Sequence, residues 1–356
     1  MKLKRLRLAD FRNITFTEVP FEHDRIFLLG ENGQGKTNVL ESIGLLPALR
    51  SFRTQDTALL IRHGAAAAQT AYLLEHEIEG TADVVLTLTP KKKTVLVDGT
   101  AVRSFSEFLG RFPAVPFCSG DIELLRGAPA VRRRWLDMVV AADDPGYLDA
   151  LRRYHAALSG RNLLLRQGAL DSAQLLAFEK VLAPCAARLT ATRRDALSAL
   201  ALALAHACGQ IGLPENAAGL AFAPNAAPEG GDAGWLDLFA RQRTADILLH
   251  STQRGPHRDD FSFLFGGRAA RDTASEGQQR GLVLGLELAW LERLRSRRPV
   301  APIVLADDIL GELDPLRKAG FWRALGGGCQ VIATGTTLPE DSGNWQVRHV
   351  RDGVVE

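Results

Sequence analysis

The octapeptide Gly30–Thr37, with the sequence GENGQGKT, constrains the fold of this chain more than any other feature. It fits the pattern G-x-x-x-x-G-K-[S/T], in which glycines let backbone N–H groups turn inward around a phosphate. The loop follows an apolar stretch, Arg25–Leu29, and precedes a segment of helical character, Asn38–Ile43. A strand, a glycine-rich loop and a helix N-terminus in this order form an anion site. These residues therefore predict an α/β fold of the P-loop NTPase type.

The phosphate loop also predicts which residues hold the nucleotide. Lys36 is expected to reach the β- and γ-phosphates, and the Thr37 hydroxyl is expected to bind Mg²⁺. No N-K-x-D string is present, which disfavours GTP and leaves ATP as the predicted cofactor. The expected nucleotide-binding residues of the loop are Gly30, Glu31, Asn32, Gly33, Gln34, Gly35, Lys36, Thr37 and Asn38.

A second apolar stretch, Pro302–Ala306, ends in two acids, Asp307 and Asp308. In a phosphate-loop ATPase, the acid at the end of such a strand holds Mg²⁺ through water, and its neighbour polarises the attacking water. We therefore expect Asp307 to hold Mg²⁺ together with Thr37. The predicted catalytic residues are Lys36, Asp307 and Asp308. An acid pair that only ends a strand is the alternative for these residues taken alone.

The segment Ser275–Arg280, with the sequence SEGQQR, precedes a predicted long helix from about Gly277 to Arg295. Ser275 can cap that helix, and Gly277 allows close backbone approach, so Ser275, Gly277 and Gln278 suit a γ-phosphate. Because the chain already has a phosphate loop, this signature is expected to act on the nucleotide of another copy. The order of phosphate loop, signature, acidic strand and Gly311–Asp314 is that of ABC-type ATPases. An ordinary capped helix is the alternative for the signature alone.

The rest of the chain predicts a mixed-sheet head that is interrupted by helices. From about Arg132 to Leu249 the chain is rich in Ala, Leu and Arg at helical spacing, and Gly212–Gly234 is expected to be a loop within it. We expect an ATPase lobe at 1–130 plus 250–356 and a helical lobe with a short arm at 131–249. Two arms of roughly 50 residues, about 75 Å each, are the most that this insertion allows. Strands are expected at Lys2–Arg7, Arg25–Leu29, Asp83–Leu88, Thr94–Val97, Phe261–Phe265, Pro302–Ala306 and Gln330–Ala333, with a hairpin at Trp345–Val355.

Composition limits the class of partner. The net charge is only +2, so a nucleic-acid surface has to be a local patch rather than a property of the whole chain. The four cysteines form no C-x-x-C pair, and neither a signal peptide nor a membrane-length apolar run is visible, so we expect a cytoplasmic protein with reduced thiols and no membrane association. Candidate DNA contacts, which could equally be solvated surface charges, are Lys2, Lys4, Arg5, Arg7, Lys91–Lys93, Arg132–Arg134, Arg293, Arg295, Arg297 and Arg298.

Taken together, these motifs resemble the RecF family, whose members have an SMC-like ABC ATPase head, and the resemblance runs from end to end. It implies ATP-dependent dimerisation, weak DNA-stimulated ATPase activity and binding to single-stranded, gapped or junction DNA without sequence specificity. It also implies a role in recombinational repair, replication restart and the SOS response, with RecO and RecR as partners that help load RecA. The strings that carry it are Leu8–Asn13, Gly30–Asn38, Gly127–Asp137, Gly255–Asp260, Ser275–Arg280, Asp307–Asp308, Glu312–Asp314 and Ala333–Thr336.

Three departures keep alternatives open. Thr334–Thr336 stands where ABC transporters carry a switch histidine, so a hydroxyl is the expected γ-phosphate sensor. Cys118–Asp121 offers no glutamine for a Q-loop, and Glu276 places an acid in the signature. A non-catalytic ATP-gated DNA clamp is therefore one alternative. An ABC transporter ATPase is a second, which the missing histidine disfavours.

Overall fold

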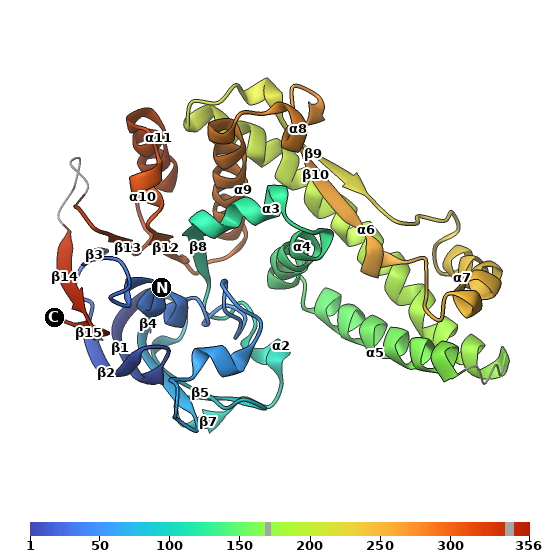
Figure 1. The fold of residues 1–356 in the computed structure, drawn as a ribbon, viewed down its shortest axis with the longest axis horizontal. Coiled ribbons are helices and arrows are strands. Elements are labelled where there is room, and N and C mark those ends of the chain that lie inside the picture. The colour runs from blue at the N-terminus through green and yellow to red at the C-terminus, as the bar shows by residue number, and fades with distance from the viewer. Residues whose placement is uncertain (168–171, 339–344) are drawn as a thin grey trace. The chain divides into compact units, whose positions relative to one another are not determined.

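The computed structural model describes residues 1–167, 172–338 and 345–356, which form two compact units. Unit 1 comprises Met1–Asp121, Ala207–Gly212 and Leu284–Glu356, and unit 2 comprises Ile122–His206 and Leu213–Val283 (Figure 1). This division differs from the expected lobes, which separate at 130 and 250. The segment 250–283, with the signature, lies in unit 2 and not with the phosphate loop.

A largely parallel sheet organises unit 1, with the strand order β15-β14-β3-β13-β12-β8. Its inner strands are apolar and almost fully buried, as parallel strands covered on both faces have to be. Only the edge hairpin is antiparallel, so the predicted mixed sheet is confirmed. The strands are β3 (Arg25–Leu29), β8 (Ala114–Cys118), β12 (Ile303–Asp307), β13 (Val331–Gly335), β14 (Gln346–Arg351) and β15 (Val354–Val355).

An antiparallel sheet of order β2-β1-β4-β5-β6-β7 forms the rest of the unit 1 core. Burial alternates along its strands, because one face packs on the core and the other faces solvent. Asp98 and Gly99 have φ of 49° and 75°, which makes the expected tight turn between β6 and β7. The strands are β1 (Lys2–Phe11), β2 (Ile14–Pro20), β4 (Ala68–His76), β5 (Gly80–Leu88), β6 (Lys93–Val97) and β7 (Thr100–Ala101).

The helices of unit 1 are mostly short. Asp314 begins α11 by accepting a hydrogen bond from the Arg317 backbone N–H, and Gly320 permits close packing, since a Cβ there would lie 2.4 Å from the Gln210 carbonyl oxygen. These helical segments are α1 (Lys36–Ile43), η1 (Thr57–Leu60), α2 (Phe105–Phe108), α10 (Ile309–Glu312) and α11 (Pro315–Leu325), while η2 (Ser119–Ile122) ends at the unit boundary.

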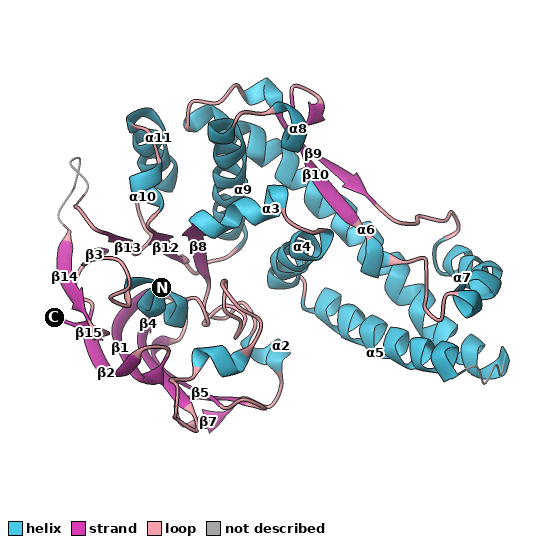
Figure 2. Cartoon of the chain, viewed as in Figure 1, coloured by secondary structure: helices cyan, strands magenta, loops and turns pink. Residues whose placement is uncertain are grey.

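Unit 2 is mainly helical, but it contains a small sheet (Figure 2). The expected loop Gly212–Gly234 is wrong in part, because β9 (Ala218–Ala223) pairs antiparallel with β10 (Asp260–Phe265). The short run AGLAFA becomes a strand through this long-range pairing, which local composition does not reveal. Other elements are α3 (Glu123–Arg126), α4 (Pro129–Asp143), α5 (Pro145–Gln167), η3 (Glu215–Ala217), α7 (Gly231–Leu248), η4 (Pro256–Arg258), β11 (Arg268–Ala269) and α8 (Ala270–Thr273).

Two long helices, α6 (Ser172–Gln210) and α9 (Glu276–Arg297), belong to both units, because the chain division falls within each of them. At about 1.5 Å per residue, the 39 residues of α6 span roughly 58 Å, which is within the predicted arm length. None of the described helices is long and apolar enough to cross a membrane.

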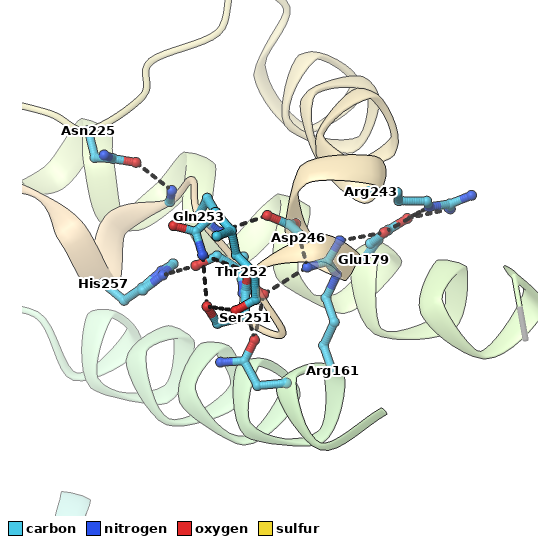
Figure 3. Close-up of polar contacts among 12 residues, drawn as sticks. Arg161, Glu179, Asn225, Arg243, Asp246, Ser251, Thr252, Gln253 and His257 are labelled. Carbon is cyan, nitrogen blue, oxygen red and sulfur yellow. Dashed lines mark hydrogen bonds and ion pairs between the residues drawn. The ribbon is translucent and has the colours of Figure 1, made fainter. Parts of the chain in front are cut away.

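A fully buried arginine ties the helices of unit 2 together. Arg161 on α5 donates to Glu179 on α6 at 3.0 Å and to Asp246 on α7 at 2.7 Å. It also donates to the Thr252 hydroxyl at 2.7 Å, and Arg243 adds a second guanidinium to Glu179 (Figure 3). Buried charges require such pairing, so this network fixes the relative register of three helices.

Candidate nucleotide site

The phosphate loop lies between the end of β3 and the start of α1. Gly33 and Gly35 have φ of +83° and +106°, a conformation that favours glycine, so both give the loop its curl. Gly30 is closely packed as well, since a Cβ there would lie 2.4 Å from the Val350 carbonyl oxygen. No side chain caps the N-terminus of α1. Its first backbone N–H groups are therefore available to an anion, as a phosphate site requires.

Lys36 lies inside this loop and is only 4% exposed. Its ammonium group donates to the carbonyl oxygens of Gly30 at 2.7 Å and Glu31 at 2.9 Å. An ammonium group has three N–H donors, so one remains for a ligand. The side chain is thus held where the loop surrounds its tip, which fits the predicted contact with phosphate.

Thr37 and Asp307 meet across the sheet, although 270 positions separate them in sequence. The Thr37 hydroxyl donates to the Asp307 carboxylate at 2.8 Å, and the Thr334 hydroxyl donates to the same oxygen at 3.0 Å. The contact follows from the strand order, because β13 lies between β3 and β12 and their carboxyl ends share one edge. The structure therefore brings together the two residues predicted to hold Mg²⁺.

The chemistry of this pair fits a hard divalent cation. Mg²⁺ takes oxygen ligands and is usually held by one or two carboxylates together with water and phosphate oxygens. Burial raises the pKa of Asp307 above its ordinary value, against the hydrogen bonds from Thr37 and Thr334 that lower it. A cation beside this carboxylate would offset the cost of burying its charge.

Asp308 follows Asp307 in a left-handed conformation, with φ of 54°. Its backbone N–H donates to the Thr334 hydroxyl at 2.9 Å. Thr334 therefore connects both acids at the end of β12, whereas Thr336 is exposed. Of the two threonines in the predicted sensor, Thr334 is the one that contacts the acidic strand.

Sequence reasoning missed the residues that brace the loop. The backbone N–H groups of Asp352 and Gly353, in the β14–β15 turn, donate to the side chain and the backbone carbonyl of Gln34 at 2.7 Å and 2.9 Å. From the other end of the chain, Asn13 accepts a hydrogen bond from Asn38 at 2.7 Å. The sequence signals were the position of Asn13 in the family string Leu8–Asn13 and the expected hairpin at Trp345–Val355, but neither predicted a contact with the loop.

A buried carboxylate, Glu41, anchors the helix that follows the loop. Glu41 is fully buried and accepts two hydrogen bonds from Arg12, at 2.8 Å and 2.6 Å. Arg53 donates to Glu41 at 3.1 Å and to the Asn38 side chain at 2.9 Å. This pairing holds α1, and with it Lys36, in a fixed position relative to the N-terminal sheet. Nothing in the spacing of these residues predicts it.

The segment Cys118–Asp121, which has no Q-loop glutamine, places a second acid, Asp121, near Asp307. In the register of β8 and β12, Cys118 lies opposite Asp307, and the Cys118 backbone N–H donates to Asp121 at 2.6 Å. Burial, with a smaller effect of the Asp307 charge, raises the pKa of Asp121 to about 7. The site therefore contains a second perturbed carboxyl group.

The signature forms a capped helix start in unit 2. The Ser275 backbone N–H donates to the Gln278 side chain at 2.8 Å, and the Ser275 hydroxyl accepts from the Gln278 backbone N–H at 3.4 Å. This reciprocal pair confirms the expected helix cap. Ser275 and Glu276 are exposed, while Gly277 is half-buried. The N-terminus of α9 is thus accessible to a ligand or to a second chain.

One basic cluster, Arg132–Arg134, is structural at its first residue. Arg132 is 8% exposed and donates to both oxygens of Asp260, at 2.7 Å and 2.9 Å. Arg132 also donates to the Gly127 carbonyl oxygen at 2.9 Å, and Arg133 donates to the Asp259 carbonyl oxygen at 2.8 Å. The expectation that Arg132–Arg134 forms one exposed DNA patch is therefore wrong for Arg132, because neighbouring acids and carbonyl groups draw its guanidinium into the core.

Other clusters are partly neutralised. Lys2 pairs with Asp24 and Lys4 with Glu75, both at 2.7 Å. Arg295 donates to the carbonyl oxygens of Leu325 and Gly327. Proximity in the sequence therefore does not by itself create a free basic surface.

No protein-family model matches the chain. Curated relatives match it over nearly its whole length. DNA replication and repair protein RecF of Rippkaea orientalis is 34% identical over 365 residues, covering 97% of this chain and 96% of the relative. The protein of the same name from Thermosynechococcus vestitus is 35% identical, with 97% and 93% covered. The chain belongs to the RecF family. It is thus a DNA replication and repair protein.

Solved structures agree with RecF membership. The structure described as the recombination mediator protein RecF-ATP in the RecFOR pathway superposes with a TM-score of 0.92 at 29% identity, covering 99% of this chain and 96% of that one. An SMC head bound to the C-terminal winged-helix domain of ScpA matches with a TM-score of 0.54 at 14% identity, which shows a shared fold only. The predicted RecF family and the α/β ABC-type head are both confirmed.

Proposed function

We propose that this RecF family member is an ATP-dependent DNA-binding protein that dimerises on ATP and acts in recombinational repair and replication restart. One observation carries the proposal. Thr37 of the phosphate loop and Asp307 of the acidic strand, predicted from two separate motifs, meet at one sheet edge, where the Thr37 hydroxyl donates to the Asp307 carboxylate at 2.8 Å. A relative whose structure is described as RecF-ATP supports ATP as the nucleotide.

In this proposal, Gly30–Asn38 surround the phosphates, and Thr37 and Asp307 hold Mg²⁺. The ion would neutralise charge on the phosphate oxygens during in-line attack of water on the γ-phosphate. Lys36 would contact the β- and γ-phosphates with its remaining N–H donor. Asp308 would orient the attacking water, and Thr334 keeps both acids in place through its hydroxyl.

The active site would be shared between two copies. Ser275, Gly277 and Gln278 of one copy would cap the γ-phosphate bound by Lys36 of the other. The exposure of Ser275 and the capped start of α9 support this role, because backbone N–H groups at a helix start favour an anion. Closure of the dimer around ATP would then control DNA binding.

The proposed DNA substrate is single-stranded, gapped or junction DNA, bound without sequence specificity. RecO and RecR are the proposed partners in loading RecA. A relative described as a recombination mediator in the RecFOR pathway supports this assignment. A slow ATPase stimulated by DNA follows from the same scheme.

A non-catalytic ATP-gated clamp is the second candidate. Asp308 is one methylene shorter than the glutamate that many ATPases use, and Cys118–Asp121 supplies no glutamine. Single-turnover ATP cleavage with and without gapped DNA separates the two, since a clamp holds ATP without cleaving it. A transporter ATPase does not fit RecF membership.

Complementation between two variants tests the shared site. Lys36→Ala removes a buried charge-assisted contact, so ATP affinity should fall by about 2–3 kcal/mol, measured by isothermal titration. Ser275→Arg should still bind ATP but should not dimerise, because its side chain crowds the facing phosphate. Mixed together, the two variants can build one intact site, so ATPase activity should partly return.

A role of Ser275 as a helix cap alone leads to a different outcome. Loss of the cap costs about 1 kcal/mol of stability and leaves dimerisation intact. If Ser275→Arg dimerises on ATP at the protein concentration that the unaltered chain needs, the shared site is wrong. If folded Lys36→Ala binds ATP as tightly as the unaltered chain, the phosphate-loop assignment is wrong.

A further inference from the structure

We infer that the loop Arg254–Asp260 in unit 2 is a binding site for the phosphate backbone of DNA, with Arg258 as its central contact. The inference rests on the proposed DNA-binding function and names residues that would carry it. The loop contains the string GPHRDD, Gly255–Asp260, which has no part in the nucleotide site described above.

Buried contacts fix the backbone of this loop. Gly255 has φ of +142°, and a Cβ there would lie 2.3 Å from the Tyr154 hydroxyl oxygen, so no side chain fits. The Gly255 backbone N–H donates to the Asn225 side chain at 3.0 Å. His257 Nε2 donates to the Thr252 carbonyl oxygen at 3.0 Å (Figure 3). Its Nδ1 accepts from the Tyr154 hydroxyl at 2.7 Å. Burial lowers the pKa of His257 to about 4, so the ring is neutral at pH 7.

The acids of this region are already paired. Asp259 is 1% exposed and accepts from Arg193 at 2.9 Å and from the Asn225 backbone N–H at 2.9 Å. Asp137 also accepts from Arg193, at 2.8 Å, and Asp260 accepts from Arg132. The loop and the residues bound to it thus carry three carboxylates and five guanidiniums, a surplus of two positive charges. The five are Arg132, Arg133, Arg193, Arg254 and Arg258.

The surplus resides in guanidiniums with unused donors. Arg258 is exposed, and its side chain makes no hydrogen bond or ion pair with any residue in the described ranges. Arg254 is also exposed and uses one N–H, to the Asn225 carbonyl oxygen at 3.2 Å. Half-buried Arg133 uses one N–H, to Asp259. Each guanidinium has five N–H donors, so most of them remain available.

A rigid loop with several available guanidiniums fits the phosphate groups of a DNA strand better than it fits a single carboxylate partner. Guanidinium forks bind phosphate oxygens bidentately, and a rigid backbone loses little conformational freedom on binding. Several such groups around one loop suit an extended polyanion, and this chain is a DNA replication and repair protein. Contacts of this kind position the protein on the backbone without reading bases.

The test measures binding of a fluorescein-labelled gapped duplex by anisotropy between 50 and 200 mM salt. Arg258→Ala should weaken binding about 10-fold, the range for one lost charge-assisted contact. It should also reduce the salt slope by about 0.9, the value for one phosphate contact. Arg268→Ala is the matched control, because Arg268 is exposed on β11 in the same unit and its loss changes the net charge equally. The control should change affinity less than about 2-fold.

The outcomes separate this inference from the proposed function. If the unaltered chain binds no gapped DNA at any salt, both fail. If it binds and Arg258→Ala behaves like Arg268→Ala, the inference alone fails and the proposed function stands. Arg258→Ala should keep the melting temperature and the ATP affinity of the unaltered chain, since Arg258 has no partner among the described side chains. A loss of ATP affinity with unchanged DNA binding would assign the loop to the nucleotide and overturn the inference. Arg258→Lys should recover the salt slope but only part of the affinity, because it keeps the charge without the fork.

Discussion

Asp121 and Asp307 bring two carboxyl groups to the ends of neighbouring strands, and burial raises the pKa of both. Their environments differ in hydrogen bonding. Asp307 accepts from the hydroxyls of Thr37 and Thr334, whereas Asp121 accepts from the Cys118 backbone N–H. Carboxyl groups with perturbed pKa values are typical of functional sites. When no cation is bound, a buried carboxylate at a cation site lowers the stability of the folded protein. This cost should be measurable in the isolated protein.

Asp121→Asn should alter how stability depends on pH. With a folded-state pKa of about 7 against an ordinary value of 3.8, folded Asp121 holds a proton between pH 4 and 7 that the unfolded chain has lost. Stability of the unaltered chain therefore falls as pH rises through this window. The asparagine variant has no titrating group at this position, so its stability should rise by about 3 kcal/mol relative to that of the unaltered chain between pH 4.5 and 7.5. Thermal unfolding in the two buffers measures the gain, and an equal difference at both pH values would contradict it.

Helices α5, α6 and α7 depend on polar contacts as well as on apolar packing. Arg161, Glu179 and Asp246 are fully buried, one on each helix. Buried ion pairs contribute little net free energy, but removing one partner leaves uncompensated charge in the core. The network therefore specifies how these helices align.

Arg161→Met should destabilise unit 2 by about 3–5 kcal/mol, because Asp246 and Glu179 lose the guanidinium between them. Arg153→Met is the control on the same helix, because the ion pair of Arg153 with Asp149 is exposed. That change should cost about 0–1 kcal/mol. Urea unfolding followed by circular dichroism measures both variants. Equal midpoints would show that the buried network contributes nothing to stability.

At the scale of the whole molecule, the proposed dimerisation on ATP can be tested separately from ATP cleavage. Asp308→Asn tests this, because asparagine tolerates the left-handed conformation of residue 308 and removes only the charge. The variant should bind ATP with unchanged affinity and slow cleavage about 100-fold or more, the range for a lost general base. It should accumulate as an ATP-bound dimer in size-exclusion chromatography. Normal turnover by this variant would exclude Asp308 as the catalytic acid.

The phosphate loop, the strands on either side of the site and the family were predictable from local sequence patterns. These features are contiguous: Gly30–Thr37 and Asp307–Asp308 follow apolar stretches that fold as β3 and β12. The spacing of residues within each motif reflects local backbone geometry, so each motif can be recognised from its own segment of the sequence. The long helix α9 and its Ser275–Gln278 cap were predictable for the same reason.

Which distant residues meet, by contrast, depends on the three-dimensional fold. Thr37 reaches Asp307, and the hairpin at Asp352 braces Gln34, across 270 and 318 positions of sequence. The same long-range contacts turned AGLAFA into β9 and drew Arg132 from an expected surface patch into the core. Such outcomes depend on strand order and on the balance of charges brought together by folding. Neither can be predicted from the spacing of neighbouring residues, because both arise when segments far apart in the chain pack against each other and bury their side chains away from water.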